Sequence, residues 1–489
     1  MAQAVHPERR AIGPREDGGL DFATLSRLSL GGAALLRQHG ARHLVFLAVN
    51  SPAFPVSIMS AAYAGVPIVP LNYRLSVDQI AEQIRELDAP LVVVDPAYVA
   101  AVQAAGVPSM LIDDFVKLAS EIEPLEPEMT ADDSVAVVLF TSGTTSKPKA
   151  VLLRHQHLMS YLMQTIEFGS ADAETATLVS NPPYHVAGVG AVLSNLYAGR
   201  RLVYLANFTP SAWLETVRAE GISNVMLVPT MLARILEHLD GAPADTPSLR
   251  GLSYGGARMP EPVLLKALEA FPEANFVNAY GLTETSSTIA VLGPEDHRLA
   301  ISDPSQRHLL FSAGRPVPGI ELQIRSEAGD VLENGETGLL WVRGSQVSGE
   351  YQGLASALDA SGWFPTRDRA RLEDGYLFIG GRADDTIIRG GENIAPAEIE
   401  DVLVNHPGVR ELAVIGLPDD EWGERIVAVI VPATEIQIDE GEVRAWCRTR
   451  LRGSRTPDQV IVIEEFPRTD TGKIIRPKLL SQLVDAGQA

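Results

Sequence analysis

Five hydroxyl side chains, one glycine and two lysines gather in one short segment of this chain, residues 141–149 (TSGTTSKPK). The segment follows an apolar run, residues 134–140, which is typical of a buried strand. A loop at the end of a strand can present backbone N–H groups, hydroxyls and ammonium groups to one point, and a polyphosphate needs such donors. The common P-loop pattern is absent, because no Gly-Lys-Ser/Thr follows Gly143 at the required spacing. The alternative is a polar surface turn.

Four further segments carry residues that could act on a phosphorylated substrate: 278–285 (NAYGLTET), 362–368 (GWFPTRD), 381–400 and 467–476 (PRTDTGKIIR). The first follows a predicted strand, so Thr283 and Glu284 should lie at the carboxyl end of that strand, where ligands bind in open α/β sheets. The Asp368 carboxylate could accept hydrogen bonds from both hydroxyls of a ribose diol. Lys473 follows a glycine near the C-terminus, and its alternative is an exposed surface lysine.

Short β-branched runs alternate with helix-period segments and must position these residues. Helices are predicted at 230–239 and 260–270, and strands at 42–49, 90–94, 134–140, 201–205, 224–228 and 275–280. The alternation predicts an α/β fold with mainly parallel sheets that helices cover. From about 311 to 381, short strands and turns predict a small β-rich subdomain. After it, a compact α+β pattern follows, with helices at 396–405 and 440–451 and strands at 409–416, 425–431 and 459–463.

Length and composition restrict the classes of protein. A chain of 489 residues is too long for one core and predicts at least two domains. The net charge of −22 argues against nucleic acid or an anionic membrane as a partner, whereas ATP needs only a local cluster of lysines. Cys447 is the only cysteine, which excludes an internal disulfide and favours a cytoplasmic location, although secreted bacterial proteins can also lack cysteine. Residues 44–73 are uncharged, but prolines and a glycine divide them, so a buried strand, helix and strand are expected. Residues 1–19 have no apolar core and predict no targeting segment.

In this order, the five segments resemble the motifs of the adenylate-forming superfamily, which includes acyl- and aryl-CoA ligases, nonribosomal peptide adenylation domains and firefly luciferase. The resemblance implies that ATP and Mg²⁺ activate a carboxylic acid as an acyl-adenylate, which a thiol then attacks. It also implies a large N-terminal AMP- and acyl-binding domain over 1–381, a hinge at 382–385 and a small mobile C-terminal domain over 386–489.

The resemblance also assigns the nucleotide site residue by residue. Lys149 would contact the β- and γ-phosphates, Thr283 the α-phosphate, and Glu284 would bind Mg²⁺. Lys473 would bridge the carboxylate and the α-phosphate, so Lys473, Thr283 and Glu284 are the predicted catalytic residues together with His185. Tyr280 would lie against the adenine and Asp368 on the ribose. The ATP-binding residues so implied are Thr141, Ser142, Gly143, Thr144, Thr145, Lys149, Ala279, Tyr280, Gly281, Asp368 and Arg382.

Three residues depart from the family pattern, because Ser146, Ala150 and Arg367 stand where the family usually has glycine. Ser146 and Ala150 keep the backbone N–H, so phosphate binding survives unless a positive φ is needed. Arg367 either fills a turn before Asp368 or adds a cation near the nucleotide. We favour the turn, with an exposed side chain.

The second half-reaction involves a different set of residues. Asp384 matches the hinge aspartate at which the C-terminal domain rotates after adenylation. The rotation would bring the predicted CoA-binding residues to the pantetheine tunnel, namely Gly390, Gly391, Glu392 and Trp422. The alternative for Trp422 is a partly buried packing residue.

The acid is predicted from residues 181–188 (NPPYHVAG), which match the segment that borders the acyl pocket. They contain no aspartate to pair with an α-ammonium, so an α-amino acid is disfavoured. Glycines that leave space, flanked by aliphatic residues, favour an aromatic or bulky alicyclic acid. The predicted substrate-binding residues are His185, Gly188, Gly255, Gly256, Tyr280 and Ile289. The alternative for His185 is a packing histidine without substrate contact.

The predicted activity is that of a carboxylic acid:CoA ligase. The alternatives are an adenylating enzyme that loads a carrier-protein phosphopantetheine, a medium- or long-chain fatty acyl-CoA ligase, and an enzyme that activates a small oxyacid such as nitrite. A non-catalytic ligand sensor is disfavoured, because Lys149, Glu284, Asp368 and Lys473 are all present. The expected partners are the acid, ATP and CoA or a carrier protein, with neither nucleic acid nor membrane, and the protein is expected to be a monomer or homodimer.

Overall fold

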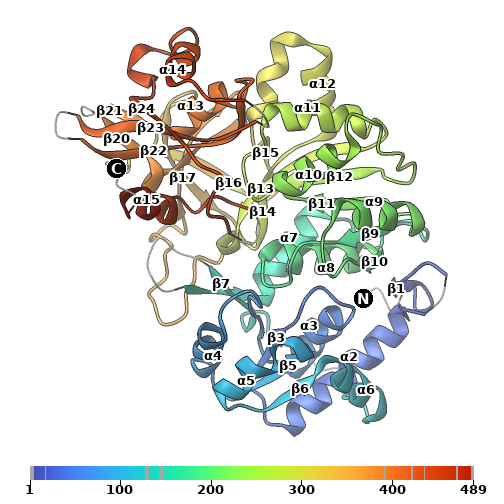
Figure 1. The fold of residues 1–489 in the computed structure, drawn as a ribbon. Helices are drawn as coiled ribbons and strands as arrows, with labels where there is room; N and C mark the ends of the chain where they lie inside the picture. The colour runs from blue at the N-terminus through green and yellow to red at the C-terminus, as the bar shows by residue number, and fades with distance from the viewer. Residues whose placement is uncertain are drawn as a thin grey trace.

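The two large sheets of the N-terminal part are mainly parallel, as predicted, and helices cover them (Figure 1). The computed structural model describes residues 5–16, 18–126, 131–141, 148–389, 392–419, 422–433, 436–469 and 472–485. The first sheet has six strands, in the order β6 (Ser109–Leu111), β5 (Pro90–Val94), β3 (His43–Leu47), β4 (Ile68–Pro70), β7 (Val135–Thr141) and β8 (Lys149–Arg154). Only its last pair, β7 with β8, is antiparallel among the pairs described.

The second sheet has nine strands, and its central strands β10, β9, β11, β12 and β13 are parallel. Its order is β15 (Arg315–Pro316), β14 (Ser287–Leu292), β13 (Asn275–Leu282), β12 (Gly251–Gly255), β11 (Asn224–Leu227), β9 (Ala176–Val179), β10 (Arg201–Tyr204), β1 (Arg10–Ile12) and β2 (Leu20–Asp21). The edge pairs are antiparallel, so β13 turns back into β14 directly after the predicted Thr283-Glu284 segment.

The helices of this part pack their apolar faces on the sheets. They are α2 (Phe22–Gln38), α3 (Ala53–Ala64), α4 (Val77–Arg85), α5 (Val99–Ala105), α6 (Ile112–Glu121), α7 (His155–Thr165), α8 (Val186–Ala198), α9 (Pro210–Ala219), α10 (Pro229–Leu239), α11 (Glu261–Ala270) and α12 (Pro294–Ser302), with short 3₁₀ helices η1 (Pro96–Tyr98), η2 (Thr283–Thr285) and η3 (Pro304–Phe311). The uncharged stretch 44–73 is β3, α3 and β4, as expected. Within the described ranges, no helix combines the length and the apolar character needed to cross a membrane.

The β-rich subdomain is an antiparallel sheet of four strands, β16 (Glu321–Arg325), β17 (Thr337–Arg343), β18 (Phe364–Glu373) and β19 (Tyr376–Arg382). Its hydrophobic side chains pack against β14, because Ile289 shares a cluster with Val342 and Phe364. Strand β19 ends at Arg382, and the 3₁₀ helix η4 (Ala383–Asp385) follows it. The strand therefore runs up to the predicted hinge.

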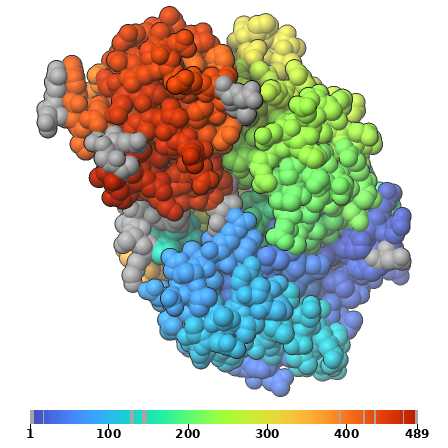
Figure 2. Space-filling view, viewed as in Figure 1, coloured from blue at the N-terminus to red at the C-terminus, as the bar shows by residue number. Residues whose placement is uncertain are grey.

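The C-terminal part folds around a sheet of five strands in the order β21 (Glu392–Ile394), β20 (Ile387–Arg389), β23 (Gly423–Pro432) and β22 (Val409–Asp419), with β24 (Gln459–Val462) beside β23. Its helices are α13 (Pro396–Leu403), α14 (Glu440–Arg448), α15 (Arg476–Asp485) and the short η5 (Gly453–Arg455). Figure 2 shows this part, in orange and red, seated against the green and yellow surface of the N-terminal part. Arg258 and Asp401 form an ion pair across this contact. The exact domain boundaries stay a prediction.

Candidate active site

The predicted phosphate loop lies between two antiparallel strands. Thr141 ends β7 and pairs with Lys149, which begins β8, and the Thr141 hydroxyl donates to the Lys149 carbonyl over 3.4 Å. The Lys149 Nζ atom lies 5.5 Å from the centroid of the Tyr351 ring. The loop residues predicted to bind phosphate, Ser142, Gly143, Thr144 and Thr145, lie outside the described residues.

Glu284 lies where the sequence predicted it, directly after the end of β13. Thr283 and Glu284 form the 3₁₀ helix η2, against which β8 packs. The Glu284 Oε1 atom accepts a hydrogen bond of 2.9 Å from the Tyr351 hydroxyl, and the Glu284 carbonyl accepts one of 2.8 Å from the Ser348 N–H. Burial and the neighbouring Glu284 carboxylate raise the pKa of Tyr351, so its hydroxyl remains a donor.

Tyr280, Asp368 and Arg382 form a second cluster, which two paired strands of the subdomain bring to β13. Asp368 on β18 and Arg382 on β19 are register partners, and the Arg382 Nε atom lies 3.1 Å from Asp368 Oδ1. The Tyr280 hydroxyl donates to the other oxygen, Oδ2. Asp368 is only 5% exposed, and this burial raises its pKa while Arg382 opposes the shift. The carboxylate is therefore held at both oxygens in one orientation.

Arg367 has the backbone conformation that a glycine would adopt without strain, with φ of +62°. The β18–β19 register is irregular shortly after it, between Arg369 and Ala370. The Arg367 side chain is exposed, and within the described part of the chain it has neither a hydrogen bond nor an ion pair. Its charge reaches Tyr351, whose pKa it lowers slightly against the larger effect of burial. Arg367 therefore lies inside strand β18, where the pairing with β17 is irregular, and not in the turn that the sequence analysis favoured. Its side chain is exposed, as expected.

Lys473 reaches this cluster from the C-terminal part. Its loop is closed by hydrogen bonds from the Lys473 N–H to the Thr469 hydroxyl (3.0 Å) and from the Thr469 N–H to the Lys473 carbonyl (2.7 Å). The loop contacts helix α10, because a Cβ atom at Gly472 would lie only 2.4 Å from the Thr230 hydroxyl. Lys473 has exposed surface, but the protein atoms around its ammonium desolvate it and lower its pKa; Arg382 lowers the pKa further, and Asp368 and Asp385 raise it.

The predicted hinge residue directly follows this cluster in the chain, whereas the predicted CoA residues Trp422 and Glu392 have other partners. Asp384 is exposed within η4, between β19 and β20. Trp422 is 42% exposed, with the Arg389 guanidinium 4.6 Å from its ring centroid, and Glu392 pairs with Arg455 at 2.9 Å. Figure 1 shows β20 and β21 at the edge of the C-terminal part that faces away from β13. Gly390 and Gly391 lie outside the described residues. The structure thus brings Lys473 near the cluster of Tyr280, Asp368 and Arg382 and leaves Trp422 and Glu392 with partners of their own.

The residues predicted to border the acid divide into two groups. His185 is half-buried as the N-cap residue of α8, with its ring centroid 4.5 Å from that of Tyr184. A Cβ atom at Gly256 would meet only Val228, at 3.6 Å, so there is ordinary space beside it. The space beside Gly188 and Gly255 is filled by backbone, since a Cβ atom there would lie 2.3 Å from the Pro182 carbonyl and 2.2 Å from the Ala279 carbonyl, respectively.

Two expectations about the acyl pocket therefore need correction. Gly188 lets α8 approach the backbone of Pro182 closely, and Gly255 lets β12 lie close to the backbone of Ala279 on β13. Neither glycine leaves empty space. Ile289 has no exposed surface, because it packs in the hydrophobic cluster between β14 and the subdomain. That places its side chain in a core, whereas the sequence analysis expected it on a pocket wall.

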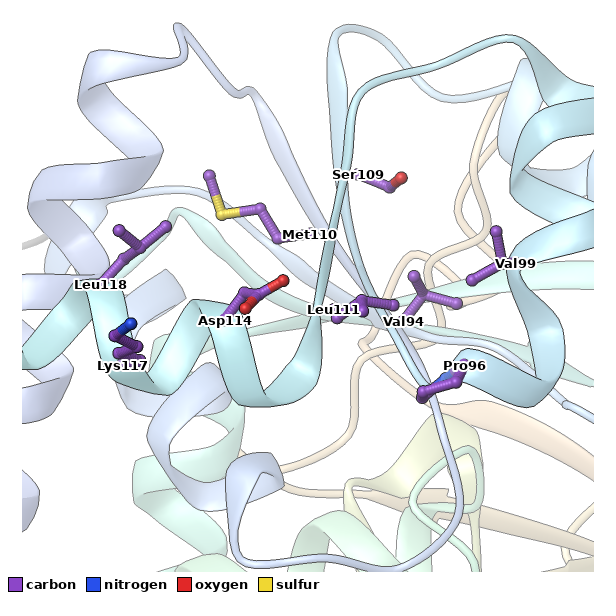
Figure 3. A pocket seen from close by; sticks show the side chains of 9 residues that line it. All are labelled: Val94, Pro96, Val99, Ser109, Met110, Leu111, Asp114, Lys117 and Leu118. Atoms are coloured by element: carbon purple, nitrogen blue, oxygen red, sulfur yellow. The ribbon is translucent and has the colours of Figure 1, made fainter.

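A separate pocket of about 710 Å³ lies in the first sheet, at its edge strand β6. Figure 3 shows its lining, which comes from β5, β6, α6 and the segment around η1 and includes Leu111, Asp114 and Lys117. None of the predicted site residues lines it. The pocket thus belongs to a different part of the molecule from the clusters around Glu284 and Asp368.

Tyr351 and Thr366 contact predicted site residues, and the sequence analysis identified neither of them. Tyr351 contacts both Lys149 and Glu284, while the Thr366 hydroxyl accepts from the Asp368 N–H over 3.1 Å. Thr366 stands two residues before Asp368, in a spacing that could have suggested a local side-chain hydrogen bond. Tyr351 offered no such signal, because its partners are distant in the sequence.

Comparisons with known proteins identify the family of the chain. The chain matches the AMP-binding enzyme family over residues 1–352 and the AMP-binding enzyme C-terminal domain over residues 398–473. It is 34% identical over 466 residues to a feruloyl-CoA synthase from Amycolatopsis sp, with 94% of this chain and 92% of the relative covered. It is 30% identical over 494 residues to an indoleacetate–CoA ligase from Aromatoleum aromaticum, with 96% and 94% covered.

The fold is also similar to a solved structure, the o-succinylbenzoate CoA synthetase from Bacillus subtilis in complex with its acyl-adenylate intermediate. The TM-score is 0.85 at 29% sequence identity, with 98% of this chain and 96% of that chain covered. The sequence matches extend over both the N-terminal and the C-terminal part, and the site residues of both parts meet at Asp368 and Lys473. The chain therefore belongs to the AMP-binding enzyme family, within the adenylate-forming superfamily that its sequence motifs resemble.

Proposed function

We propose that the protein is an ATP-dependent ligase that joins an aromatic carboxylic acid to coenzyme A. In the first step, the carboxylate attacks the α-phosphorus of ATP, which gives an acyl-adenylate and releases pyrophosphate. In the second step, the thiol of coenzyme A loses its proton and attacks the acyl carbon, which forms the thioester and releases AMP. The observation that carries the proposal is that Lys473 of the C-terminal part lies within electrostatic range of Asp368 and Arg382 of the N-terminal part.

The cluster around Asp368 suits the nucleoside end of ATP. Both carboxylate oxygens are fixed, one by Arg382 and one by Tyr280, and each keeps a further lone pair for a ribose hydroxyl. A ligand held in one orientation presents its α-phosphorus at a fixed place, and positioning of this kind supplies much of the acceleration in phosphoryl chemistry. We therefore assign Asp368, Tyr280 and Arg382 to the nucleoside.

The groups around Glu284 suit the phosphate end. Lys149 is the nearby cation from β8, and Thr283 presents a hydroxyl from η2. Phosphate oxygens are strong acceptors that favour such charge-assisted hydrogen bonds. We assign Lys149 to the outer phosphates, Thr283 to the α-phosphate, and Lys473 to the α-phosphate and the attacking carboxylate. A lysine suits this last position, because its ammonium can meet two anions without a fixed bidentate geometry.

The residues present also fit a magnesium ion carried by ATP, which supports Glu284 as its protein ligand. Mg²⁺ usually binds one or two carboxylates together with substrate phosphates. Within the described ranges, no group of three or more His, Cys, Asp or Glu residues could hold a metal by itself, so a site shared with phosphates is the arrangement that fits. When bound there, the ion would neutralise part of the charge on the leaving pyrophosphate. A solved relative, the B. subtilis o-succinylbenzoate CoA synthetase, has been captured with ATP and magnesium.

The proposal of an aromatic acid rests on two observations. The relatives named above are a feruloyl-CoA synthase, an indoleacetate–CoA ligase and an o-succinylbenzoate CoA synthetase, and all three names contain an aromatic acid. In this chain, the segment around His185 is uncharged and begins the apolar helix α8. An apolar wall with one imidazole favours a flat ring over a zwitterionic amino acid.

The test is a screen for pyrophosphate release with ATP and Mg²⁺, with and without coenzyme A. The panel contains hydroxycinnamic, indoleacetic and benzoic acids, a C10 and a C16 fatty acid, nitrite, and an amino acid. We expect release with an aromatic acid, and AMP and a thioester only when coenzyme A is added. Thioester formation only with a holo-carrier protein would identify the carrier-loading alternative. Preference for a fatty acid or nitrite would reject the aromatic substrate.

A further inference from the structure

We propose that Tyr351 is a positioning residue that holds Glu284 and Lys149 in place at the phosphate end of the site. Its hydroxyl would orient the carboxylate, and its ring would orient the ammonium. The inference rests on the proposed function for the roles of Glu284 and Lys149. It concerns a side chain that lies in neither of the sequence motifs that supply these two residues.

The position of the Tyr351 side chain carries the proposal. Its hydroxyl donates to Glu284 Oε1 over 2.9 Å, and the Lys149 Nζ atom lies 5.5 Å from its ring centroid. Lys149 belongs to the six-stranded sheet, whereas Glu284 follows β13 of the nine-stranded sheet. One side chain therefore contacts an anion and a cation that come from different sheets.

The backbone around Tyr351 is fixed to both of these partners. The Ser348 N–H donates to the Glu284 carbonyl over 2.8 Å. On the other side, the Gln352 N–H donates to the Ala150 carbonyl over 2.9 Å, beside Lys149. Residues 348–352 thus tie η2 to β8, and the tyrosine ring has little freedom to move away.

An ion pair strengthens this tie. The Arg154 guanidinium at the end of β8 binds the Glu350 carboxylate through two hydrogen bonds, of 2.8 and 2.7 Å. Both side chains are about 70% buried, with 29% and 28% exposed, and a bidentate pair has a defined geometry. The segment that carries Tyr351 is therefore held by side chains as well as by backbone.

The chemistry explains why a tyrosine suits this place. A neutral hydroxyl orients the Glu284 carboxylate and leaves its full negative charge for a metal ion, whereas a lysine partner would neutralise it. The face of an aromatic ring attracts an ammonium without occupying its N–H donors, so those of Lys149 stay available for phosphate. Tyr351 can thus hold both charges close together while each keeps its capacity for the ligand.

The experiment compares Tyr351→Phe and Tyr351→Leu with a matched control, Tyr376→Phe. Tyr376 also contacts one carboxylate and one cation, and neither is assigned to ATP. Its hydroxyl donates to Asp296 Oδ1 over 2.7 Å, and the Arg315 guanidinium lies 4.1 Å from its ring centroid. Binding of a non-hydrolysable ATP analogue is measured by calorimetry with and without Mg²⁺. Thermal unfolding of each variant reports its stability.

We expect Tyr351→Phe to lower the gain in analogue affinity on addition of Mg²⁺ by about tenfold, because a hydrogen bond to a charged group is lost. Binding without Mg²⁺ should stay near wild type, since the ring remains over Lys149. Tyr351→Leu should also weaken binding without Mg²⁺ by roughly threefold, because the cation–π contact is lost. Tyr376→Phe should change neither quantity.

A double-mutant cycle tests the link to the carboxylate. Glu284→Gln should reduce the Mg²⁺ effect, and adding Tyr351→Phe to it should cause little further loss, because both changes act on one contact. An unchanged Mg²⁺ effect in a folded Tyr351→Phe, or full additivity in the cycle, would overturn the proposal. Since calorimetry needs no acid, the inference can fail or stand independently of the search for the substrate.

Discussion

Replacement of Arg367 by glycine and, separately, by alanine distinguishes the strain of its backbone in β18 from the use of its charge. The residue has φ of +62°, a conformation that costs a residue with a Cβ atom about 1 kcal/mol and glycine little. Arg367→Ala keeps the strain and removes the charge, whereas Arg367→Gly removes both. Because glycine also raises the entropy of the unfolded chain, which costs about 0.5–1 kcal/mol of stability, the glycine variant should be more stable than the alanine variant by at most about 0.5 kcal/mol.

The kinetic effect of Arg367 should be small. Its side chain is exposed, and within the described residues it has no hydrogen-bond or ion-pair partner. A screened, exposed charge contributes little. We therefore expect kcat/KM for ATP to stay within about threefold of wild type in both variants. If the guanidinium instead binds the nucleotide, its loss would remove a charge-assisted contact of about 1.5–3 kcal/mol, or roughly tenfold to a hundredfold.

The assay is pyrophosphate release under varied ATP, combined with chemical denaturation of the three proteins. A Lys variant, Arg367→Lys, serves as a further control, because it keeps the charge and the strain. A tenfold or greater loss in both Arg367→Gly and Arg367→Ala, with recovery in Arg367→Lys, would refute the interpretation of Arg367 as a strained residue whose charge is not used. It would make Arg367 a nucleotide-binding residue of this chain.

Three further predictions concern the C-terminal part. Lys473→Ala should abolish most adenylation and spare thioester formation from a supplied acyl-adenylate. The pKa of Lys473 is lowered, so its ammonium should lose its proton, and wild-type adenylation should fall, as pH rises and before it reaches the ordinary lysine pKa of 10.5. In Lys473→Arg this fall should move to higher pH, because the guanidinium keeps its proton, and a pH–rate profile would show both effects. Asp384→Pro should keep adenylation and reduce thioester formation in the same two assays, because proline would fix the backbone of the predicted hinge in one pose. Loss of both steps would argue against a hinge. Arg258→Ala removes the ion pair with Asp401 and should slow only adenylation, by a fewfold in single-turnover measurements. An equal effect on both steps would show that the pair does not stabilise the adenylating arrangement of the two parts.

The parts of the site that could be predicted are those with a local cause. Apolar runs that end in polar loops gave the strands before Thr141 and Thr283, because hydrophobic periodicity and turn residues act over a few positions. The uncharged stretch 44–73 resolved into a strand, a helix and a strand for the same reason. Arg367 was identified as a departure from the family pattern, and the structure adds the positive φ that a glycine at this position would adopt without strain.

The remaining parts depend on contacts between distant segments, which one sequence does not report. A glycine in a sequence is equally consistent with empty space and with a close backbone neighbour, and Gly188 and Gly255 have the neighbour. The sequence predicted Ile289 as an apolar substrate-binding residue, but strands of the β-rich subdomain cover its side chain. Tyr351 contacts Lys149 and Glu284 only because three separate strands and turns converge. No periodicity within any one of them indicates this convergence.

The position of the C-terminal part suggests why its contacts with the rest of the protein should be weak. In this pose the charge of Lys473 acts on Asp368 and Arg382, while β20 and β21 lie at the edge that faces away from β13. Under the proposed function this pose would serve the first half-reaction, and the second would require the C-terminal part to turn. The Arg258–Asp401 pair across the contact is 39% and 38% exposed, and burial raises the pKa of Asp401 to about 6. Desolvation of Asp401 offsets part of the attraction, so this pair should stabilise the contact only weakly. Under the proposed function, a weak pair of this kind would let the contact be exchanged once pyrophosphate has left, whereas a large apolar interface would hold the enzyme in its first step.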